Sequence, residues 1–394
     1  MIANKNITKV FYLFLFFHLF LWTLVPSISN VNLPLDTIEA LAWASNLEWG
    51  YNKHPPLSAY IVGSIYFLFG ANDWAYYLLS QIFVIIAFIY IWKLSKEFFK
   101  NRIFSLLSLV ILEGIFFFNY TTPEFNVYVC QLPLKALVAY FFWKGINDKR
   151  LINWIMTGLF SALGILTHYS FVFLILSLLV FFIFFVKKNK DMIKNFFLSF
   201  IIFILLISPH LFWLVENNFS SIFYAINRTG IEDKIWINHF YNPIIFLLKQ
   251  LGMLVLFFII FFSIFSFNKN KNIKFKTYDK KNIFLLCISL LPILIVFFVS
   301  VISGAKIRTM WMSTFYLFFG IFFFYYFKNK INLKKIINYL YIVVFIFFLI
   351  PITYLYVSLN NDNKRTDFPG QEIARLVQNK WDDNFRNNIK IVVG

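Results

Sequence analysis

The sequence predicts an all-α membrane protein whose chain crosses the bilayer many times. Hydrophobic residues make up 60% of the 394 positions, and 56 positions are phenylalanine. This composition excludes an ordinary soluble domain and requires many apolar segments of bilayer-spanning length. The net charge of +18 is explained by basic loops between such segments, so no nucleic-acid partner is expected.

Apolar segments of spanning length recur along the chain and predict about eleven transmembrane helices. In chain order these helices are expected near residues 10–26, 75–92, 103–118, 127–143, 154–167, 169–186, 196–214, 244–266, 283–302, 312–327 and 336–356. Residues 57–70 are also apolar, but this segment is short for a transmembrane helix and follows Pro55-Pro56, so we expect an interfacial helix there.

The composition changes after about residue 357, where the chain becomes polar. An amphipathic helix is expected to begin near Pro369, and the final residues, IKIVVG, are expected to form a strand. We therefore expect a transmembrane domain at residues 1–356 and an outer tail at 357–394. Because one helix and one strand cannot bury a core, the tail is interpreted as the start of a truncated α/β domain, and a tail that docks on the membrane part is the alternative.

Charge placement predicts which side of the membrane each loop faces, because Lys and Arg collect in cytoplasmic loops. With the N-terminus inside, most of the 36 basic residues fall in inner loops. The short outer loops keep only Lys53, Arg228, Lys234, Lys306 and Arg308. Acidic residues show the opposite bias, and those in or beside outer loops are Asp36, Glu39, Glu48, Asp73, Glu124, Glu216, Glu232 and Asp233. The C-terminus and any chemistry are therefore expected on the outer side.

The loop after the first span concentrates ionisable side chains and is the first candidate site. It contains Asp36, Glu39, Lys53 and His54, and ionised groups beside a span are costly unless they have a partner or a function. The two acids are three positions apart, so a short helix places them on one face. In the alternative, Asp36 caps the helix and Glu39 pairs with Lys53.

Three further groups of polar residues lie at expected outer span ends. Glu124 and Asn126 open the fourth span, where an N-terminal cap is the alternative role. His168 lies in the turn LGILTHYS, where a packing role is the alternative. Lys306 and Arg308 are cations in an outer loop that should avoid them, which points to an anionic ligand such as phosphate. Snorkelling toward lipid headgroups is their alternative.

Two kinds of site are not indicated by the sequence. The five histidines are scattered without a His-x-x-x-His pair, so no metal is expected. No Gly-rich phosphate loop is present, so neither a nucleotide cofactor nor a nucleotide-driven motor is expected.

These motifs, taken together, resemble those of the family 39 glycosyltransferases of the GT-C superfamily. That family includes the protein O-mannosyltransferases and the bacterial transferases that add aminoarabinose to lipid A. The matching segments, in chain order, are Asp36 with Glu39, Trp43, GYNKHPPL at 50–57, PEFNVYVCQLPLKAL at 123–137, GILTHYS at 164–170, SPHLFWL at 208–214 and GAKIRTMW at 304–311. The resemblance implies a GT-C type bundle with helices in the outer loops.

The resemblance also implies an enzyme that transfers a sugar from a polyprenyl-phosphate carrier to an envelope acceptor, either a lipid such as lipid A, a glycan or a protein. Such an enzyme is expected to be a multi-pass protein of the bacterial inner membrane, in contact with membrane lipids and with its active site facing the periplasm. Asp36 and Glu39 are the expected catalytic residues, and Asp36 is the expected base. The expected substrate-binding residues are Lys53, His54, Glu124, Asn126, His168, Lys306 and Arg308. A transporter or lipid flippase, or an inactive truncated transferase, is the alternative.

Overall fold

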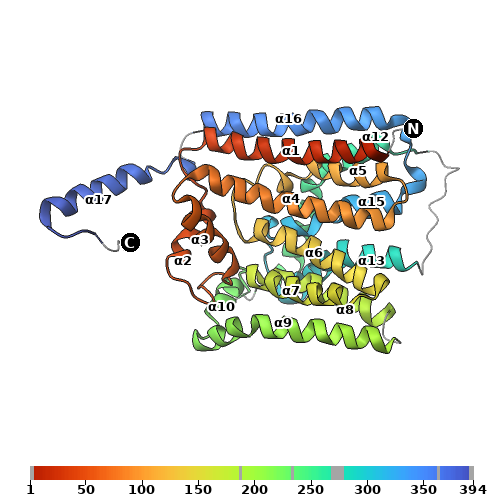
Figure 1. Cartoon of the computed structure of the whole chain (residues 1–394), viewed down its shortest axis with the longest axis horizontal. Helices are drawn as coiled ribbons and strands as arrows, with labels where there is room; N and C mark the ends of the chain where they lie inside the picture. Colours follow the sequence, from red (N-terminus) through yellow and green to blue (C-terminus); the bar gives the residue numbers. More distant parts are fainter. Residues whose placement is uncertain (1–3, 186–188, 232–234, 268–278, 362–363, 390–394) are drawn as a thin grey trace.

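The computed structural model is a bundle of helices whose long members run side by side along one axis (Figure 1). It describes residues 4–185, 189–231, 235–267, 279–361 and 364–389. Within these ranges the chain forms helices and no strand, apart from an isolated bridge between Phe265 and Ile331. The predicted all-α class is therefore confirmed. The predicted terminal strand, and the acids Glu232 and Asp233, fall outside the described ranges.

Among the described residues, four helices are long and apolar enough to cross a bilayer: α1 (Asn4–Ser29), α4 (Asp73–Phe98), α9 (Lys190–Glu216) and the stretch Leu333–Asn360, which contains α16 (Ile336–Asn360). Two bent pairs raise the total to six when each is counted as one span. The chain is thus a multi-pass membrane protein. The other expected spans are present within the described ranges as continuous helices, short helices or broken helices.

The bent pairs replace two spans that the sequence predicts to be straight. Residues 244–266 fall in α11 (Asn238–Met253) and α12 (Val255–Ile264), which meet at 50°. Residues 283–302 fall in α13 (Lys280–Ser289) and α14 (Leu291–Ser303), which meet at 44°. Pro292, in the first turn of α14, explains the second break because proline has no N–H to continue the helical ladder.

The third predicted span is also broken. Here α5 (Arg102–Val110) gives way to short 3₁₀ turns at Ile111–Gly114 and Phe116–Phe118. Glu113, in the first turn, is buried, and its carboxylate bonds the imidazole of His18 at 2.8 Å and the amide of Asn119 at 3.1 Å. A hydrogen-bonded polar cluster with three buried members, His18, Glu113 and Asn119, thus lies where the regular helix ends.

The last two broken spans end in ordinary helices. Residues 169–186 begin with a 3₁₀ turn at Tyr169–Phe171 and continue as α8 (Val172–Phe185). Residues 312–327 comprise the 3₁₀ helix η4 (Thr309–Tyr316) and α15 (Phe319–Tyr326). The remaining spans are regular: α6 (Val127–Asp148) packs between α4 and α7 (Leu151–Thr167), and α7 packs against α9.

Glycine permits the closest helix contacts in the core. A Cβ atom on Gly320 of α15 would lie 1.8 Å from the carbonyl oxygen of Ser108 in α5. A Cβ atom on Gly158 of α7 would lie 2.4 Å from the carbonyl oxygen of Ser199 in α9. Only glycine lets these backbones approach so closely, as is common where membrane helices pack.

Short helices gather at the end of the bundle from which the C-terminal helix projects (Figure 1). They are α2 (Leu35–Ala44), α3 (Leu57–Phe69) and α10 (Ser220–Asn227). The predicted amphipathic tail helix is present as α17 (Gly370–Asn384). The N-terminus lies at the opposite end (Figure 1), an arrangement compatible with the predicted topology, whose sidedness stays a prediction.

Candidate active site

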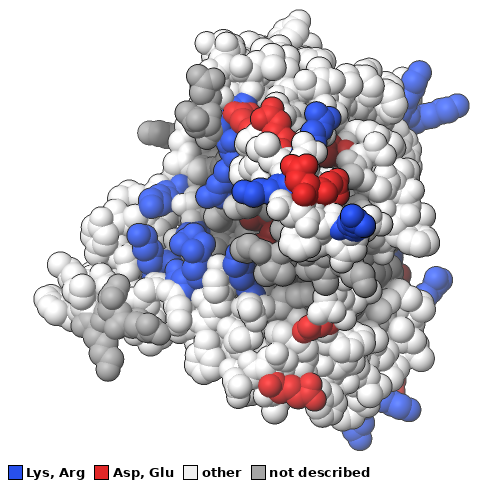
Figure 2. All heavy atoms as spheres, turned by 90° about the vertical axis from the view of Figure 1, so that its left-hand side faces the viewer, with Lys and Arg blue, Asp and Glu red and all other residues white. Residues whose placement is uncertain are grey.

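A cavity of about 850 Å³ opens among the short helices at this end of the bundle. Basic and acidic side chains gather on the corresponding face of the molecule (Figure 2). Six of the predicted site residues line the cavity: Asp36, Glu39, Lys53, His54, His168 and Arg308. The structure therefore brings together side chains that come from distant parts of the sequence.

Helix α2 fixes the two acids on the cavity wall. Both line the cavity from one face of this ten-residue helix. The helix is anchored by Thr37, whose hydroxyl donates to the carbonyl of Phe125 at 3.2 Å. It is also anchored by the N–H of Asp36, which donates to the carboxylate of Glu124 at 3.2 Å. These two hydrogen bonds, to Phe125 and to Glu124, fix the position of Asp36 at the start of the helix.

The acids differ in their partners. Glu39 forms an ion pair with the ammonium group of Lys53, as in the alternative considered from the sequence. The capping half of that alternative is wrong, because no side chain caps α2 and backbone N–H groups of its first turn bond the carbonyl of Pro34. Among the described residues no hydrogen bond reaches the Asp36 carboxylate. Asp36 is thus the acid that faces the cavity without a polar partner.

Burial and charge set the protonation of this region. Burial, followed by the charge of Glu39, raises the pKa of Asp36, and Arg365, Lys53 and Arg228 act against the rise. Burial, followed by the charge of Asp36, raises the pKa of Glu124 to about 7. The two neighbouring carboxyl groups therefore resist ionising together.

The basic side chains of the same loop respond in opposite ways. The hydrogen bond to Glu39 raises the pKa of Lys53, so this residue remains a cation. Burial, followed by the charge of Lys53, lowers the pKa of His54 to about 4. His54 is therefore neutral near pH 7 and offers a ring for packing, which it does against His168 at 5.3 Å between ring centroids.

The loop that carries Lys53 and His54 is held by residues that do not line the cavity. The indole N–H of Trp213 donates to the carboxylate of Glu48 at 3.0 Å, and His210 Nδ1 lies 2.6 Å from the carbonyl of Trp49. Gly50 packs so tightly that an added Cβ would lie 2.3 Å from the Trp213 ring. His210 thus has a structural role in holding the loop.

Glu124 and Asn126 lie beside the main cavity and line a side pocket of about 80 Å³. The amide oxygen of Asn126 accepts from the N–H groups of Tyr128 and Val129 at 3.0 and 3.1 Å, so it caps α6. The capping alternative therefore describes Asn126, whereas Glu124 contacts the backbone of Asp36. Of this pair, Glu124 is the one connected to the acid site.

His168 ends α7 and shapes the inner wall of the cavity. Its Nδ1 atom lies 2.9 Å from the Ser170 hydroxyl, and its carbonyl accepts from Gln131 at 3.1 Å. Its ring packs on Tyr128 with centroids 5.1 Å apart. His168 thus has the packing role that the sequence offered as an alternative, and it also lines the cavity.

The two predicted phosphate-binding cations are separated by the structure. Arg308 lines the cavity, and its guanidinium lies over the ring of Trp311 at 6.0 Å. Lys306 is exposed and is absent from the cavity wall; its backbone N–H bonds the carbonyl of Thr229 at 2.8 Å.

Three basic residues were missed as site candidates. Arg228 and Arg365 line the cavity, the first from the end of α10 and the second from the C-terminal segment. Lys135 of α6 is 2% exposed and donates to the Thr314 hydroxyl at 2.7 Å, close to the cavity-lining Phe315 ring. Arg228 belongs to the outer-loop cations, and a lysine within an apolar span is itself a signal. Nothing in the local sequence distinguishes Arg365.

Comparison with known proteins identifies the class of fold. Residues 53–213 match a family model described as dolichyl-phosphate-mannose-protein mannosyltransferase. The structure of ArnT from Cupriavidus metallidurans bound to undecaprenyl phosphate is similar with a TM-score of 0.60 and 13% identity, over 96% of this chain and 73% of that one. The apo structure of the same ArnT is similar with a TM-score of 0.59 and 14% sequence identity, over 86% of this chain and 63% of that one.

A search of curated protein sequences found no match. The family model matches residues 53–213 and the two structures match the fold, so the predicted GT-C resemblance and the predicted GT-C type bundle are confirmed. At this low sequence identity, the likeness to the solved structures establishes the fold of the chain and does not identify its substrates.

Proposed function

We propose that this protein is a membrane glycosyltransferase that takes a sugar from a polyprenyl-phosphate carrier. The observation that carries the proposal is the carboxylate of Asp36, which has no hydrogen-bond partner among the described residues and shares a cavity with Lys53, Arg228, Arg308 and Arg365. An acid beside clustered cations suits a reaction in which a hydroxyl loses a proton while a phosphate leaves. The undecaprenyl phosphate in the ArnT structure supports a carrier of this type.

The walls of the cavity suit a lipid-linked donor. Much of the lining is apolar and includes Val296, Val299, Met310 and Phe315. Such a surface accommodates a polyprenyl chain through apolar burial. The cations face the same space, so the carrier phosphate has positively charged partners at the polar end of the cavity.

The reaction transfers one glycosyl group. The acceptor oxygen forms a bond to the anomeric carbon of the sugar, and the bond from that carbon to the carrier phosphate oxygen breaks. Asp36 receives the acceptor proton, and the phosphate leaves with the electron pair, stabilised by the cavity cations. Glu39, the other predicted catalytic acid, holds Lys53 in place through their ion pair.

In this proposal residues 1–356 form the catalytic membrane domain and 357–394 an outer tail. The site faces the periplasm from the inner membrane, where a lipid, glycan or protein acceptor has access. His54, Glu124, Asn126 and His168 shape the substrate space around Asp36. Lys306 lies next to the cavity rather than on it, so Arg308 is the proposed phosphate partner of the two.

The test uses the full chain in lipid nanodiscs with polyprenyl-phosphate sugars and a membrane-lipid extract as acceptor. Mass spectrometry follows the release of free polyprenyl phosphate and the gain of a sugar by the acceptor. We expect turnover in the wild type and none in Asp36→Asn, which keeps the size of the side chain and removes its charge. Glu216→Gln is the matched control, because this exposed acid at the end of α9 does not line the cavity.

Two results would reject the proposal. Equal turnover in wild type and Asp36→Asn would exclude this acid as the base. If the wild type moves labelled polyprenyl lipids across proteoliposomes and transfers no sugar to any supplied acceptor, the protein is a transporter instead.

A further inference from the structure

The turn η7 (Arg365–Asp367) brings a C-terminal arginine to the acid site. This turn follows the outer end of α16, and Arg365 lines the same cavity as Asp36 and Glu39. Most other lining residues belong to the membrane domain, so Arg365 is a contribution from the proposed outer tail.

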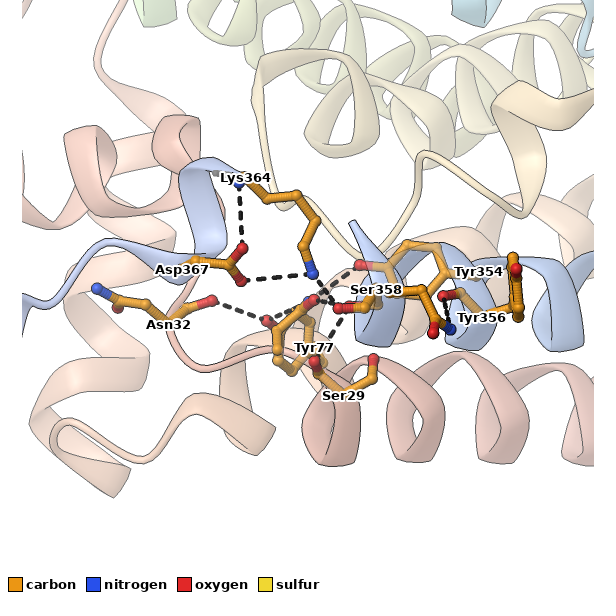
Figure 3. A network of polar contacts seen from close by, with 10 residues as sticks. Ser29, Asn32, Tyr77, Tyr354, Tyr356, Ser358, Lys364 and Asp367 are labelled. Carbon is orange, nitrogen blue, oxygen red and sulfur yellow. Dashed lines mark hydrogen bonds and ion pairs between the residues drawn. The ribbon is translucent and has the colours of Figure 1, made fainter. Parts of the chain in front are cut away.

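A network of hydrogen bonds fixes the segment before this turn to the membrane helices (Figure 3). The hydroxyl of Ser358 lies 3.1 Å from the carbonyl of Ser29 and 2.6 Å from the amide oxygen of Asn30. The amide of Asn30 in turn donates to the hydroxyls of Tyr77 and Tyr354, both at 3.0 Å. The outer ends of α1, α4 and α16 are thus joined through side chains.

Two more contacts close the turn itself (Figure 3). The Lys364 backbone N–H donates to the Asp367 carboxylate at 3.1 Å, and the Lys364 ammonium group lies 3.4 Å from the same carboxylate. That ammonium group also donates to the carbonyl of Ser358. We call the residues Ser29, Asn30, Tyr77, Tyr354, Ser358, Lys364 and Asp367 the C-terminal clamp.

Charged and titratable groups face Asp36 from every neighbouring element. The charge of Glu39 raises the pKa of Asp36, and the charge of Asp36 raises the pKa of Glu124. The cations Lys53, Arg228 and Arg365 lower the pKa of Asp36. Tyr128, Tyr224, His54, His168 and Arg308 also line this space. Of the cations, Arg365 lowers the pKa of Asp36 most, and it also lowers that of Glu124.

We propose that Arg365 is a positioning residue of the acid site, held by the C-terminal clamp beside Asp36 and Glu124 so that Asp36 carries a negative charge when substrates bind. The proposal deepens the proposed function, on which it rests in treating Asp36 as the base. Arg365 acts through Asp36, since its guanidinium supplies the nearby positive charge that a partly buried carboxylate needs.

A direct test measures protonation without relying on turnover. A hydrophobic carbodiimide modifies protonated carboxyl groups, and peptide mass spectrometry reports labelling of Asp36 and Glu124 separately across a pH series. In Arg365→Gln we expect the midpoint of Asp36 labelling to move upward by about one pH unit, the low end of the effect of a nearby opposite charge. Arg365→Lys should restore most of the shift because it restores the charge.

Matched variants separate this effect from a general loss of charge. Arg375→Gln removes an exposed cation from α17 that does not line the cavity, and it should leave the midpoint unchanged. Asp367→Asn weakens the clamp and should shift the midpoint in the same direction as Arg365→Gln, by a smaller amount. The double variant Arg365→Gln with Asp367→Asn should shift no further than Arg365→Gln alone, because the clamp acts through Arg365.

An unchanged midpoint in Arg365→Gln would overturn the proposal, as would an equal shift in Arg375→Gln. Additive shifts in the double variant would overturn the role of the clamp. A turnover assay of the same variants distinguishes the two proposals. If the wild type transfers no sugar, the proposed function fails, while the labelling midpoints still decide the role of Arg365.

Discussion

Replacing Arg308 should weaken binding of the carrier phosphate, whereas replacing its neighbour Lys306 should not. The two cations lie in one short loop, yet only Arg308 lines the cavity. A charge-assisted hydrogen bond contributes roughly 1.5–3 kcal/mol, and each 1.4 kcal/mol changes an affinity about tenfold. Because the Arg308 side chain is exposed, solvent screening favours the lower limit. We therefore expect Arg308→Ala to weaken the affinity about tenfold.

The assay is equilibrium binding of a polyprenyl phosphate to the protein in nanodiscs of neutral lipid. Wild type, Arg308→Ala and Lys306→Ala are compared at low and high salt, because a phosphate contact loses strength as salt rises. The wild type and Lys306→Ala should share one affinity and one salt dependence. An equal loss in both variants would show a diffuse effect of loop charge, and no loss in Arg308→Ala would remove this residue from the phosphate site.

Three further predictions test other parts of the structure. Glu124→Gln should gain thermal stability over the wild type as pH rises from about 4.5 to 7, because across that window the unfolded chain loses this proton while the folded protein keeps it, which destabilises the wild type. Gly320→Ala should lower the free energy of unfolding by about 1–3 kcal/mol through overpacking against Ser108, whereas Gly252→Ala, with open space around it, should not. An alkaline phosphatase fusion after residue 357 should be active, since the charge bias places this point outside; an inactive fusion would contradict the topology.

Much of the fold could be predicted from the sequence because apolar length and loop charge are local properties. Helices at the positions of α3 and α17 follow from composition alone, and both are present. The broken helices could not be predicted in this way. In the turn at Glu113 the carboxylate bonds His18, which lies in another helix, and only the folded bundle brings the two together.

The site shows the same division between local and distant information. Asp36, Lys53 and Arg308 were predictable because charged groups at outer span ends are costly without a role. Arg365 was not predictable, because its place on the cavity depends on the C-terminal clamp. Lys306 and Arg308 were indistinguishable in sequence, since only the path of the backbone decides which side chain enters the cavity.

The acids of α2 illustrate why spacing alone cannot assign a chemical role. Asp36 and Glu39 lie on the same helix face and line the same cavity. Lys53 pairs with Glu39 and not with Asp36, whose carboxylate has no partner in the described part of the chain, so the ion pair selects which acid is available to accept a proton. The same pair holds the Lys53 charge near Asp36, where it offsets the cost of burying a second carboxylate. Glu39 therefore contributes to the acid site through Lys53. Removing Lys53 should raise the proton affinity of Asp36 less than removing Arg365, whose charge acts on it more strongly.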